Sequence, residues 1–326
     1  MNRRSLLCAL PLWAALSAAA QTLTPSETIT FYVPFPAGGS SDVFARTLAP
    51  GLAKQLQRTV VVENLAGASG SIAANKVLSR GPSGDALFLG SPTETILAPA
   101  TLKAVKYKPS DLRLVYLISK PSLGIYVRGD LPVNSIDELV TYAKTHKDKP
   151  LSYGSVGVGS VYHLAGDAYM QAVGLPMTHI PYRGGAPLLQ DLMGGQLDMA
   201  LFPVDGHLAK MASSGKMRVI GMTGKVRSPL FPNAGTFAES VALPKFSTVD
   251  VWGGVFVPKA TPEAAVQTVH RAVVAAMAEP ETRKAMELAA GVPLMPTMTL
   301  EQLANFYTGE TQRFAEATQR ANLEPN

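Results

Sequence analysis

Cysteine is almost absent from this 326-residue chain, because its single cysteine, Cys8, lies close to the N-terminus. The rest of the chain therefore has no disulfide, no thiolate metal site and no cysteine nucleophile. Several catalytic motifs are missing as well. There is no H-E-x-x-H zinc motif, no G-x-x-x-x-G-K-[ST] phosphate loop and no full G-x-G-x-x-G dinucleotide fingerprint. We expect neither a cofactor nor a metal ion.

Charged residues are few, and neither sign dominates strongly. They make up 16% of the chain, and the formal net charge is +5. No cluster of lysine and arginine is interleaved with aromatic residues, so nucleic acid is not an expected partner. A mild positive excess spread over the chain suits a protein that meets small anions.

The first twenty residues have the pattern of a cleaved export signal. Arg3 and Arg4 form a basic start, Leu6–Leu16 is an apolar core, and Ala18–Ala20 offers a small-residue cleavage site. The apolar core is too short to span a membrane, which takes about 20 residues. We expect a periplasmic mature protein that begins near Gln21 and carries a net charge of +3. The export route, general secretory or twin-arginine, stays open.

Short β-rich runs alternate with helical stretches, and this alternation predicts α/β architecture with largely parallel central sheets. Helix starts are marked by the capping boxes Ser135-x-x-Glu138, Thr236-x-x-Glu239 and Thr299-x-x-Gln302 and by Thr261-Pro262-Glu263. Pro50 should kink or shorten the helical run 42–57. The predicted strands are 29–33, 60–63, 86–90, 114–119, 123–128, 151–154, 178–181, 199–202, 218–223 and 249–257.

The segment VPFPAGGSSDVFAR, residues 33–46, begins as a strand and ends as a helix. Its connecting loop places Gly38 and Gly39 before Ser40 and Ser41. The first turn of a helix carries N–H groups without intrahelical partners and the positive end of the helix dipole. Glycine lets a ligand approach that backbone, and serine can cap the helix or bind the ligand. The combination predicts an anion-binding turn.

A second segment, SYGSVGVGSVYHLAGDAY at residues 152–169, repeats this pattern. A strand leads through a serine- and glycine-rich turn into a helix that begins near Ser160. Two uncharged loops of this kind in one chain predict a ligand held at both ends. A third glycine-rich turn, residues 178–187, carries Tyr182 and Arg183. Arg183 either pairs with a carboxylate or is a solvated surface residue.

Two acids and a histidine near these loops allow more than one interpretation. Glu94 follows a predicted strand and is favoured as a helix-start residue, whereas Asp205 either faces a cleft or starts a helix. His163 and Asp167 are spaced i, i+4 on a predicted helix, as two metal ligands can be. Such a pair is more often a surface or capping interaction, so we expect no metal here.

Several motifs occur in order from about residue 28 to residue 320. They are Val33–Asp42, Val62-Glu63-Asn64 with Gly67 and Gly70, Tyr153-Gly-Ser-x-Gly-x-Gly-Ser160 with His163-Leu-Ala-Gly166, Thr178-His-Ile-Pro-Tyr-Arg-Gly184, Asp191-Leu192 with Gly195-Gln196 and Asp198, Gly215-Lys216-x-Arg218, and Trp252-x-Gly254. As a set they are highly specific, and the chain resembles the Bug-type substrate-binding proteins of the tripartite tricarboxylate transporter family.

This resemblance implies a two-domain periplasmic-binding-protein architecture of type II, which closes on a small ligand like a flytrap. We expect residues 1–20 to be the signal peptide. Residues 21–123 plus 249–326 would form a discontinuous first domain, and residues 124–248 the second. The protein would act as a monomer that delivers its ligand to transporter membrane components or reports it to a sensor kinase.

The resemblance also implies a carboxylate ligand between the domains. The loop Phe35–Asp42 would bind one carboxylate and the loop Ser155–Ser160 the distal end. Glu94 and Asp205, if they face the cleft, favour a mono- or dicarboxylate, including an amino or aromatic acid, over citrate. The expected ligand-binding residues are Phe35, Ala37, Gly38, Gly39, Ser40, Asp42, Thr93, Ser155, Gly157, Gly159, Ser160, Tyr182, Gly184, Ala186 and Asp205.

An enzymatic function stays open as the alternative. A periplasmic hydrolase or lyase could use Ser40 or Ser155 as its nucleophile, and His163 is the histidine closest in sequence that could serve as the base. The chain also departs from its relatives near the expected pocket. Pro203 stands where an acid commonly follows the strand, so the ligand cannot be transferred from any one relative.

Overall fold

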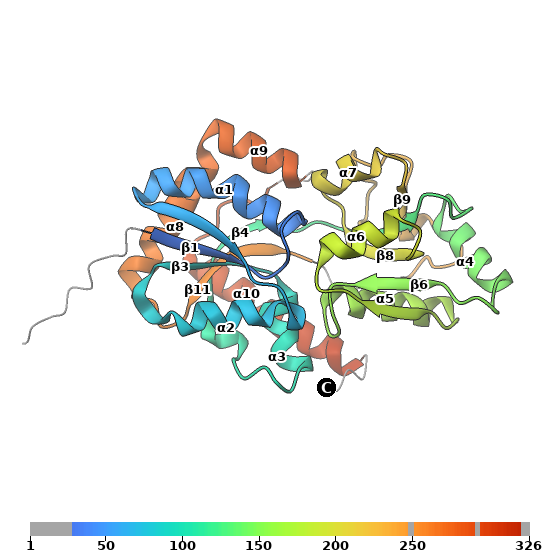
Figure 1. The fold of residues 1–326 in the computed structure, drawn as a ribbon, viewed down its shortest axis with the longest axis horizontal. Helices are drawn as coiled ribbons and strands as arrows, with labels where there is room; N and C mark the ends of the chain where they lie inside the picture. The colour runs from blue at the N-terminus through green and yellow to red at the C-terminus, as the bar shows by residue number, and fades with distance from the viewer. Residues whose placement is uncertain (1–27, 247–250, 291–293, 321–326) are drawn as a thin grey trace, which may run out of the picture.

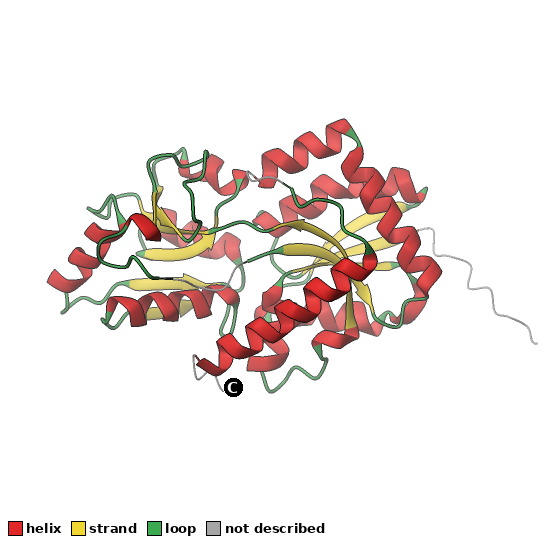
Figure 2. Ribbon diagram, turned by 180° about the vertical axis from the view of Figure 1, so that it is seen from behind, coloured by secondary structure: helices red, strands yellow, loops and turns green. Residues whose placement is uncertain are grey.

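Two lobes, each built around one β-sheet, make up the computed structural model, which describes residues 28–246, 251–290 and 294–320. The lobes lie side by side (Figure 1). Seen from behind, both lobes carry helices around their strands (Figure 2). The predicted two-domain α/β fold with largely parallel sheets is confirmed.

The first lobe contains a five-stranded sheet in the order β2-β1-β3-β11-β4. β1 runs parallel to β2 and β3, whereas β11 runs antiparallel to β3 and β4. All residues of β3 are buried, as expected for a strand in a sheet covered by helices on both faces. The elements are β1 (Thr28–Val33), α1 (Ser40–Leu56), β2 (Thr59–Asn64), α2 (Ser71–Ser79), β3 (Ala86–Gly90), α3 (Ala98–Thr101), β4 (Leu112–Ser119), β11 (Gly253–Pro258), α8 (Glu263–Ala278), α9 (Pro280–Ala290) and α10 (Leu300–Arg320).

The second lobe contains a six-stranded sheet in the order β10-β9-β5-β8-β6-β7. β6 runs parallel to β7 and β8, whereas β5 runs antiparallel to β8 and β9. The elements are β5 (Leu123–Arg128), α4 (Ile136–Thr145), β6 (Ser152–Ser155), α5 (Val161–Val173), β7 (Thr178–Pro181), α6 (Gly185–Met193), β8 (Met199–Pro203), α7 (Gly206–Ala212), β9 (Met217–Met222) and β10 (Gly235–Thr236).

The chain passes between the lobes twice. β4 ends at Ser119 in the first sheet, and β5 begins at Leu123 in the second. The chain later returns to the first sheet as β11. We therefore propose that the first domain comprises residues 21–123 plus 249–326 and that residues 124–248 form the second.

The predicted strands all have counterparts, but the last one begins later than expected. β11 starts at Gly253, and Val251 and Trp252 before it are not in a strand. The expected start, Val249, lies outside the described residues. The expectation that Pro50 shortens its helix is wrong, because α1 continues through Pro50 to Leu56.

Three of the four predicted helix-start signals form their hydrogen bonds. Ser135 caps α4 by accepting from the Glu138 N–H at 3.1 Å. Thr236 with Glu239 and Thr299 with Gln302 both make reciprocal capping contacts. Thr261 does not cap α8, because Pro262 occupies the N-cap position. The Thr261 hydroxyl is buried without a hydrogen-bond partner.

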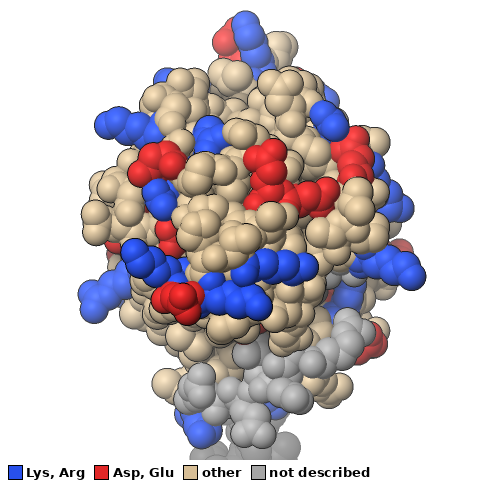
Figure 3. All heavy atoms as spheres, turned by 90° about the vertical axis from the view of Figure 1, so that its right-hand side faces the viewer, with Lys and Arg blue, Asp and Glu red and all other residues tan. Residues whose placement is uncertain are grey.

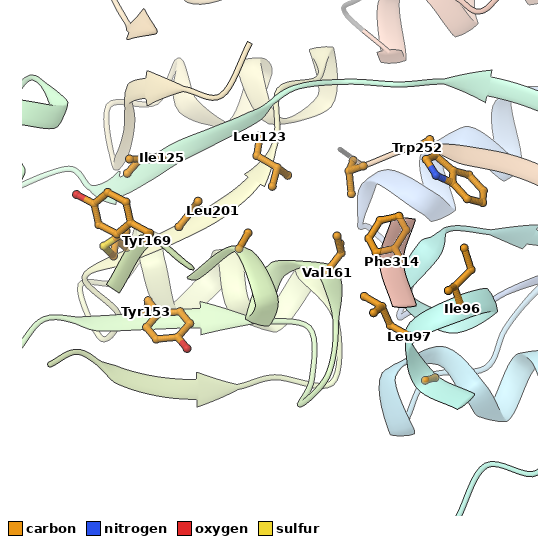
Figure 4. Packing of buried hydrophobic residues seen from close by; sticks show 14 of the residues in the cluster. Ile96, Leu97, Leu123, Ile125, Tyr153, Val161, Tyr169, Leu201, Trp252 and Phe314 are labelled. Atoms are coloured by element: carbon orange, nitrogen blue, oxygen red, sulfur yellow. The ribbon is translucent and has the colours of Figure 1, made fainter. Parts of the chain in front are cut away.

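One cluster of buried apolar side chains continues from one lobe into the other. Figure 4 shows Leu123 and Val161 of the second lobe on the side that faces Trp252 and Phe314. The Trp252 indole N–H donates to Glu310 at 2.8 Å, so this ring is fixed where the lobes meet. No helix among the described residues is long and apolar enough to cross a membrane. On the outer end of the second lobe, basic and acidic side chains are interspersed (Figure 3).

Candidate functional site

The loop between β1 and α1 is held in shape by a chain of side-chain contacts. The Gly38 N–H donates to Asp42 Oδ2 at 3.0 Å, and Arg46 Nε donates to Asp42 Oδ1 at 2.8 Å. Asn64 links Arg46 to the Phe35 carbonyl. Burial acts to raise the pKa of Asp42, but these hydrogen bonds outweigh it and the pKa is lowered. Asp42 thus engages the Gly38 N–H that we expected to face an anion.

The loop between β6 and α5 is held by two serines. Ser155 Oγ lies 2.8 Å from His179 Nε2 and accepts from the Gly157 N–H at 3.2 Å. Ser160 is the N-cap of α5 and accepts from the His163 N–H at 3.2 Å. Both serines are fully buried, so their hydroxyls shape the loop itself.

Glycine in the second lobe allows the first lobe to approach. Gly157 has a φ of +141°, and a Cβ there would lie 2.5 Å from Ser69 Oγ. Ser69 in turn donates to the Val158 carbonyl at 2.7 Å. A Cβ at Gly39 would instead meet only ordinary contacts, the nearest at 3.8 Å. In the same way, a Cβ at Gly159 would collide with Thr101, and one at Gly184 with Pro36.

A small, partly open space, which we call the inner cavity, lies between the lobes and has a volume of about 70 Å³. It is bounded by the first turn of α1, the segment that follows β3, both crossing segments and the second lobe. Its lining residues are Ser40, Ser41, Phe44, Leu89, Gly90, Ser91, Glu94, Ile118, Ser119, Pro121, Tyr162, Pro203, Asp205, Val251, Trp252 and Gly253.

Asp205 both starts a helix and faces the inner cavity, so the two alternatives left open for it hold together. It is the N-cap of α7 and accepts from the Leu208 N–H at 2.7 Å. Its other oxygen accepts from the Ser40 hydroxyl at 2.7 Å, across the boundary between the lobes. Only 1% of Asp205 is exposed, and this burial raises its pKa to about 6.

Glu94 is the second acid of the inner cavity. It lies in the single π-helical turn Thr93–Leu97 after β3 and is fully buried. Ser91 donates to it with both its backbone N–H and its hydroxyl. Burial raises the pKa of Glu94 to about 8. The expectation of a helix-start residue is correct but incomplete, because it missed the place of Glu94 on the cavity wall.

Tyr162, from the second lobe, lines the inner cavity together with these two acids. Its ring stacks on Phe202 at 4.5 Å between centroids. Burial, with Glu94 and Asp205 as further causes, raises the pKa of Tyr162. Nothing in the local sequence singled out Tyr162, because its role depends on neighbours from distant segments.

A larger and more open space, the outer cavity, lies elsewhere between the lobes and has a volume of about 510 Å³. Its lining includes Ala68 and Ser69, whose φ angles of 45° and 50° are unusual for residues other than glycine. Arg183 lies on its wall, and the Tyr182 hydroxyl donates to Asp191 at 2.8 Å. The lining residues are Phe35, 67–72, Asn75, Leu102, Ala104, Val105, 156–158 and 181–183.

The structure distributes the expected ligand-binding residues over both cavities and the contacts around them. Ser40 and Asp205 line the inner cavity, and Phe35, Gly157 and Tyr182 line the outer one. The others line neither cavity; they are Ala37, Gly38, Gly39, Asp42, Thr93, Ser155, Gly159, Ser160, Gly184 and Ala186. Among these, the Thr93 hydroxyl joins the lobes by accepting from the Val161 N–H at 3.2 Å.

The histidine beside Ser155 is His179, not His163 as the alternative enzymatic function required. His163 stacks on His179 at 4.0 Å and lies 3.3 Å from Asp167. Burial, followed by the influence of His163, lowers the pKa of His179 to about 4. Among the described residues, no group of three or more histidine, cysteine or acidic side chains could hold a metal ion.

Two lobes, two crossings and cavities between them define the class of two-lobed solute-binding proteins. Residues 44–323 match the tripartite tricarboxylate transporter family receptor, and the chain belongs to this family. The family comprises transport receptors rather than enzymes, which decides against the hydrolase or lyase alternative.

Relatives of known sequence or structure cover almost the whole chain. A UPF0065 protein of Bordetella pertussis is 31% identical over 96% of this chain and 95% of its own length. The periplasmic binding protein BugD is 31% identical, with a TM-score of 0.84 over 92% of this chain and 99% of its own. MatC of Rhodopseudomonas palustris, with bound malate, is 28% identical, with a TM-score of 0.80 over 89% of this chain and 98% of its own.

A further Rhodopseudomonas palustris protein was solved with adipate. It is 26% identical to this chain and has a TM-score of 0.83 over 93% of this chain and all of its own length.

Proposed function

We propose that this protein is an exported solute-binding protein that captures a small carboxylate between its lobes. The observation that carries the proposal is the inner cavity, which lies between the lobes and is bounded by the first turn of α1 at Ser40 and Ser41. N–H groups at a helix start and the positive end of its dipole favour a carboxylate. The malate and adipate bound by two relatives support this ligand class.

The ligand in this proposal is a mono- or dicarboxylate, including amino and aromatic acids. The residues from Phe35 to Asp42 and from Ser155 to Ser160 form and close the site. The loaded protein serves uptake through transporter membrane components, or sensing through a receptor kinase, as a monomer. Since the chain starts with a signal-like segment, N-terminal sequencing of the exported product should begin near Gln21. An intact Met1 on exported protein would contradict cleavage.

Calorimetric titration of the purified protein tests the ligand class. We expect at least one of citrate, succinate, glutamate and nicotinate to bind, and neither glucose nor putrescine. A ligand present at 100 times its dissociation constant should also stabilise the fold by about 2.7 kcal/mol. Binding of the sugar or the diamine, with no binding of any acid, would overturn the carboxylate proposal.

A further inference from the structure

The wall of the inner cavity carries acids but no positive side chain. Glu94 and Asp205 line its wall, and no lysine, arginine or histidine does so among the described residues. The titratable groups on which Glu94 acts are Tyr107, Tyr162 and Tyr307, which are neutral at physiological pH. The pKa of Asp205 is about 6, so Asp205 is ionised at pH 7 and a ligand made only of carboxylates would meet like charge here.

Both acids are arranged as hydrogen-bond acceptors. Asp205 receives the Ser40 hydroxyl on one oxygen and the Leu208 N–H on the other. Glu94 receives the Ser91 N–H on one oxygen and the Ser91 hydroxyl on the other. Donors on both oxygens favour the ionised form of a carboxyl group, but burial outweighs them at Glu94 and raises its pKa to about 8. The protein supplies neutral donors to these groups, but no cation.

Aromatic rings lie on the same wall. Phe44, Tyr162 and Trp252 all line the inner cavity. Ring faces attract a cation, most strongly at desolvated sites. The indole of Trp252 is held by Glu310 and the ring of Tyr162 by Phe202, so both surfaces are fixed in advance.

From this arrangement we propose that Glu94 and Asp205 bind a cationic nitrogen of the ligand, so that the protein selects amino acids or nitrogen-heterocyclic acids over acids without nitrogen. This inference rests on the proposed function, because it places the ligand's carboxylate at Ser40 and Ser41 and its nitrogen at the two acids. The selectivity in this proposal comes from two acids of this chain. Glu94 lies in the first lobe and Asp205 in the second.

The number of protons released on binding distinguishes this arrangement from one in which Glu94 stays protonated and donates to the ligand. Burial raises the pKa of Glu94 to about 8, so the empty site holds a proton at pH 7. A cation beside Glu94 lowers that pKa, and binding then releases a proton. If a protonated Glu94 instead donated to a ligand carboxylate, it would keep its proton and binding would release none.

Two matched pairs of acids provide the test: glutamate against glutarate, and nicotinate against benzoate. We titrate each by calorimetry at pH 7 in two buffers of different ionisation enthalpy. We expect the nitrogen-bearing member of at least one pair to bind 10-fold or more tighter. Glutamate, whose ammonium is already charged at pH 7, should release a proton, whereas nicotinate should bind with little net change, because its ring nitrogen takes up the proton that Glu94 gives up. Glu94→Gln should bring the two affinities of that pair within about 2-fold and abolish any release by glutamate. Glu301→Gln, which changes an exposed acid on α10, is the control and should behave like the wild type.

The outcomes separate the two proposals. If the nitrogen-free acids bind as tightly as their partners, if glutamate binds without releasing a proton, or if Glu94→Gln leaves the ratio unchanged, the nitrogen proposal is wrong while the carboxylate function stands. If none of the four acids binds, the nitrogen proposal is wrong, and the titrations with citrate and succinate decide whether the carboxylate function stands. Asp205→Asn, which keeps the size of the side chain, should also lower the ratio, and an unchanged ratio would remove Asp205 from the proposal.

Discussion

The inner and outer cavities lie between the same two lobes but differ in what surrounds them. The inner cavity is small, and its wall carries two buried acids and three aromatic rings. The outer cavity is about 510 Å³ and lies against the glycine- and serine-rich loops, with Arg183 on its wall. The loops that were most conspicuous in the sequence thus contribute mainly to the outer cavity and to the contacts that close the lobes.

This difference between the cavities separates two roles, closure of the lobes and recognition of the ligand. Glycine at Gly157 lets the second lobe come close to Ser69, whereas Glu94 and Asp205 set the charge that a ligand meets. Among the described residues, four hydrogen bonds join the lobes around these cavities: Ser40 to Asp205, Ser69 to Val158, Val161 to Thr93, and His207 with Gly38. Asp205 takes part in both roles, whereas Gly157 and Glu94 allow closure and recognition to be altered separately.

The largest expected effect comes from blocking closure. Gly157→Ala puts a Cβ against Ser69 Oγ at a positive φ, so we expect ligand affinity to fall at least 10-fold. The lobes should stay folded, because opening relieves the clash. Gly309→Ala, at an exposed position of α10, is the matched control, because a Cβ there meets no atom within 4 Å. Calorimetry measures the ligand affinity, and small-angle scattering measures how far the lobes close. Equal affinities for the two variants would show that Gly157 has no special part in closure.

The next effect concerns the pH dependence of stability. The pKa of Glu94 is raised from 4.5 to about 8 in the folded protein, so its contribution is fully present below pH 4.5 and is lost as the pH rises through 8. Glu94→Gln should remove this loss, which amounts to about 1.4 kcal/mol per pH unit at most. Denaturant unfolding at pH 5 and pH 8 measures it. A variant whose stability changes with pH as much as the wild type would show that Glu94 is not the group responsible.

A smaller effect is expected at the first loop, which shapes the cleft without lining the inner cavity. Asp42→Ala leaves the Gly38 N–H and Arg46 without their acceptor and should cost about 1–3 kcal/mol at pH 7. Because the pKa of Asp42 is lowered by folding, the difference from wild type should shrink as the pH falls below 3.8. Chemical denaturation measures both values.

The exposed Asp148→Ala is the control for this substitution and should be neutral. No loss of stability in Asp42→Ala at pH 7 would mean that the clamp around Gly38 does not hold the loop.

Local patterns predicted most of the fold because the features that encode it are local. Strand 178–181 has the predicted bounds, and Ser160 caps a helix that starts at Val161, one residue after the expected position. The differences from the structure concern Pro50 and the start of the last strand. Pro50 is accommodated inside α1, and β11 begins only at Gly253. The site was less predictable, because Tyr162 and Trp252 contribute through neighbours that are distant in sequence.

The sequence by itself determined the alternation of strands and helices, the family, the two glycine–serine turns and the absence of cysteine chemistry. Each of these is written in short stretches of residues whose backbone preferences act locally. Only the tertiary structure decided that Glu94 and Asp205 share one cavity, that Asp42 holds Gly38, and that Gly157 faces Ser69. Burial and close approach depend on segments from both lobes, and burial is what raises the pKa values of the two acids.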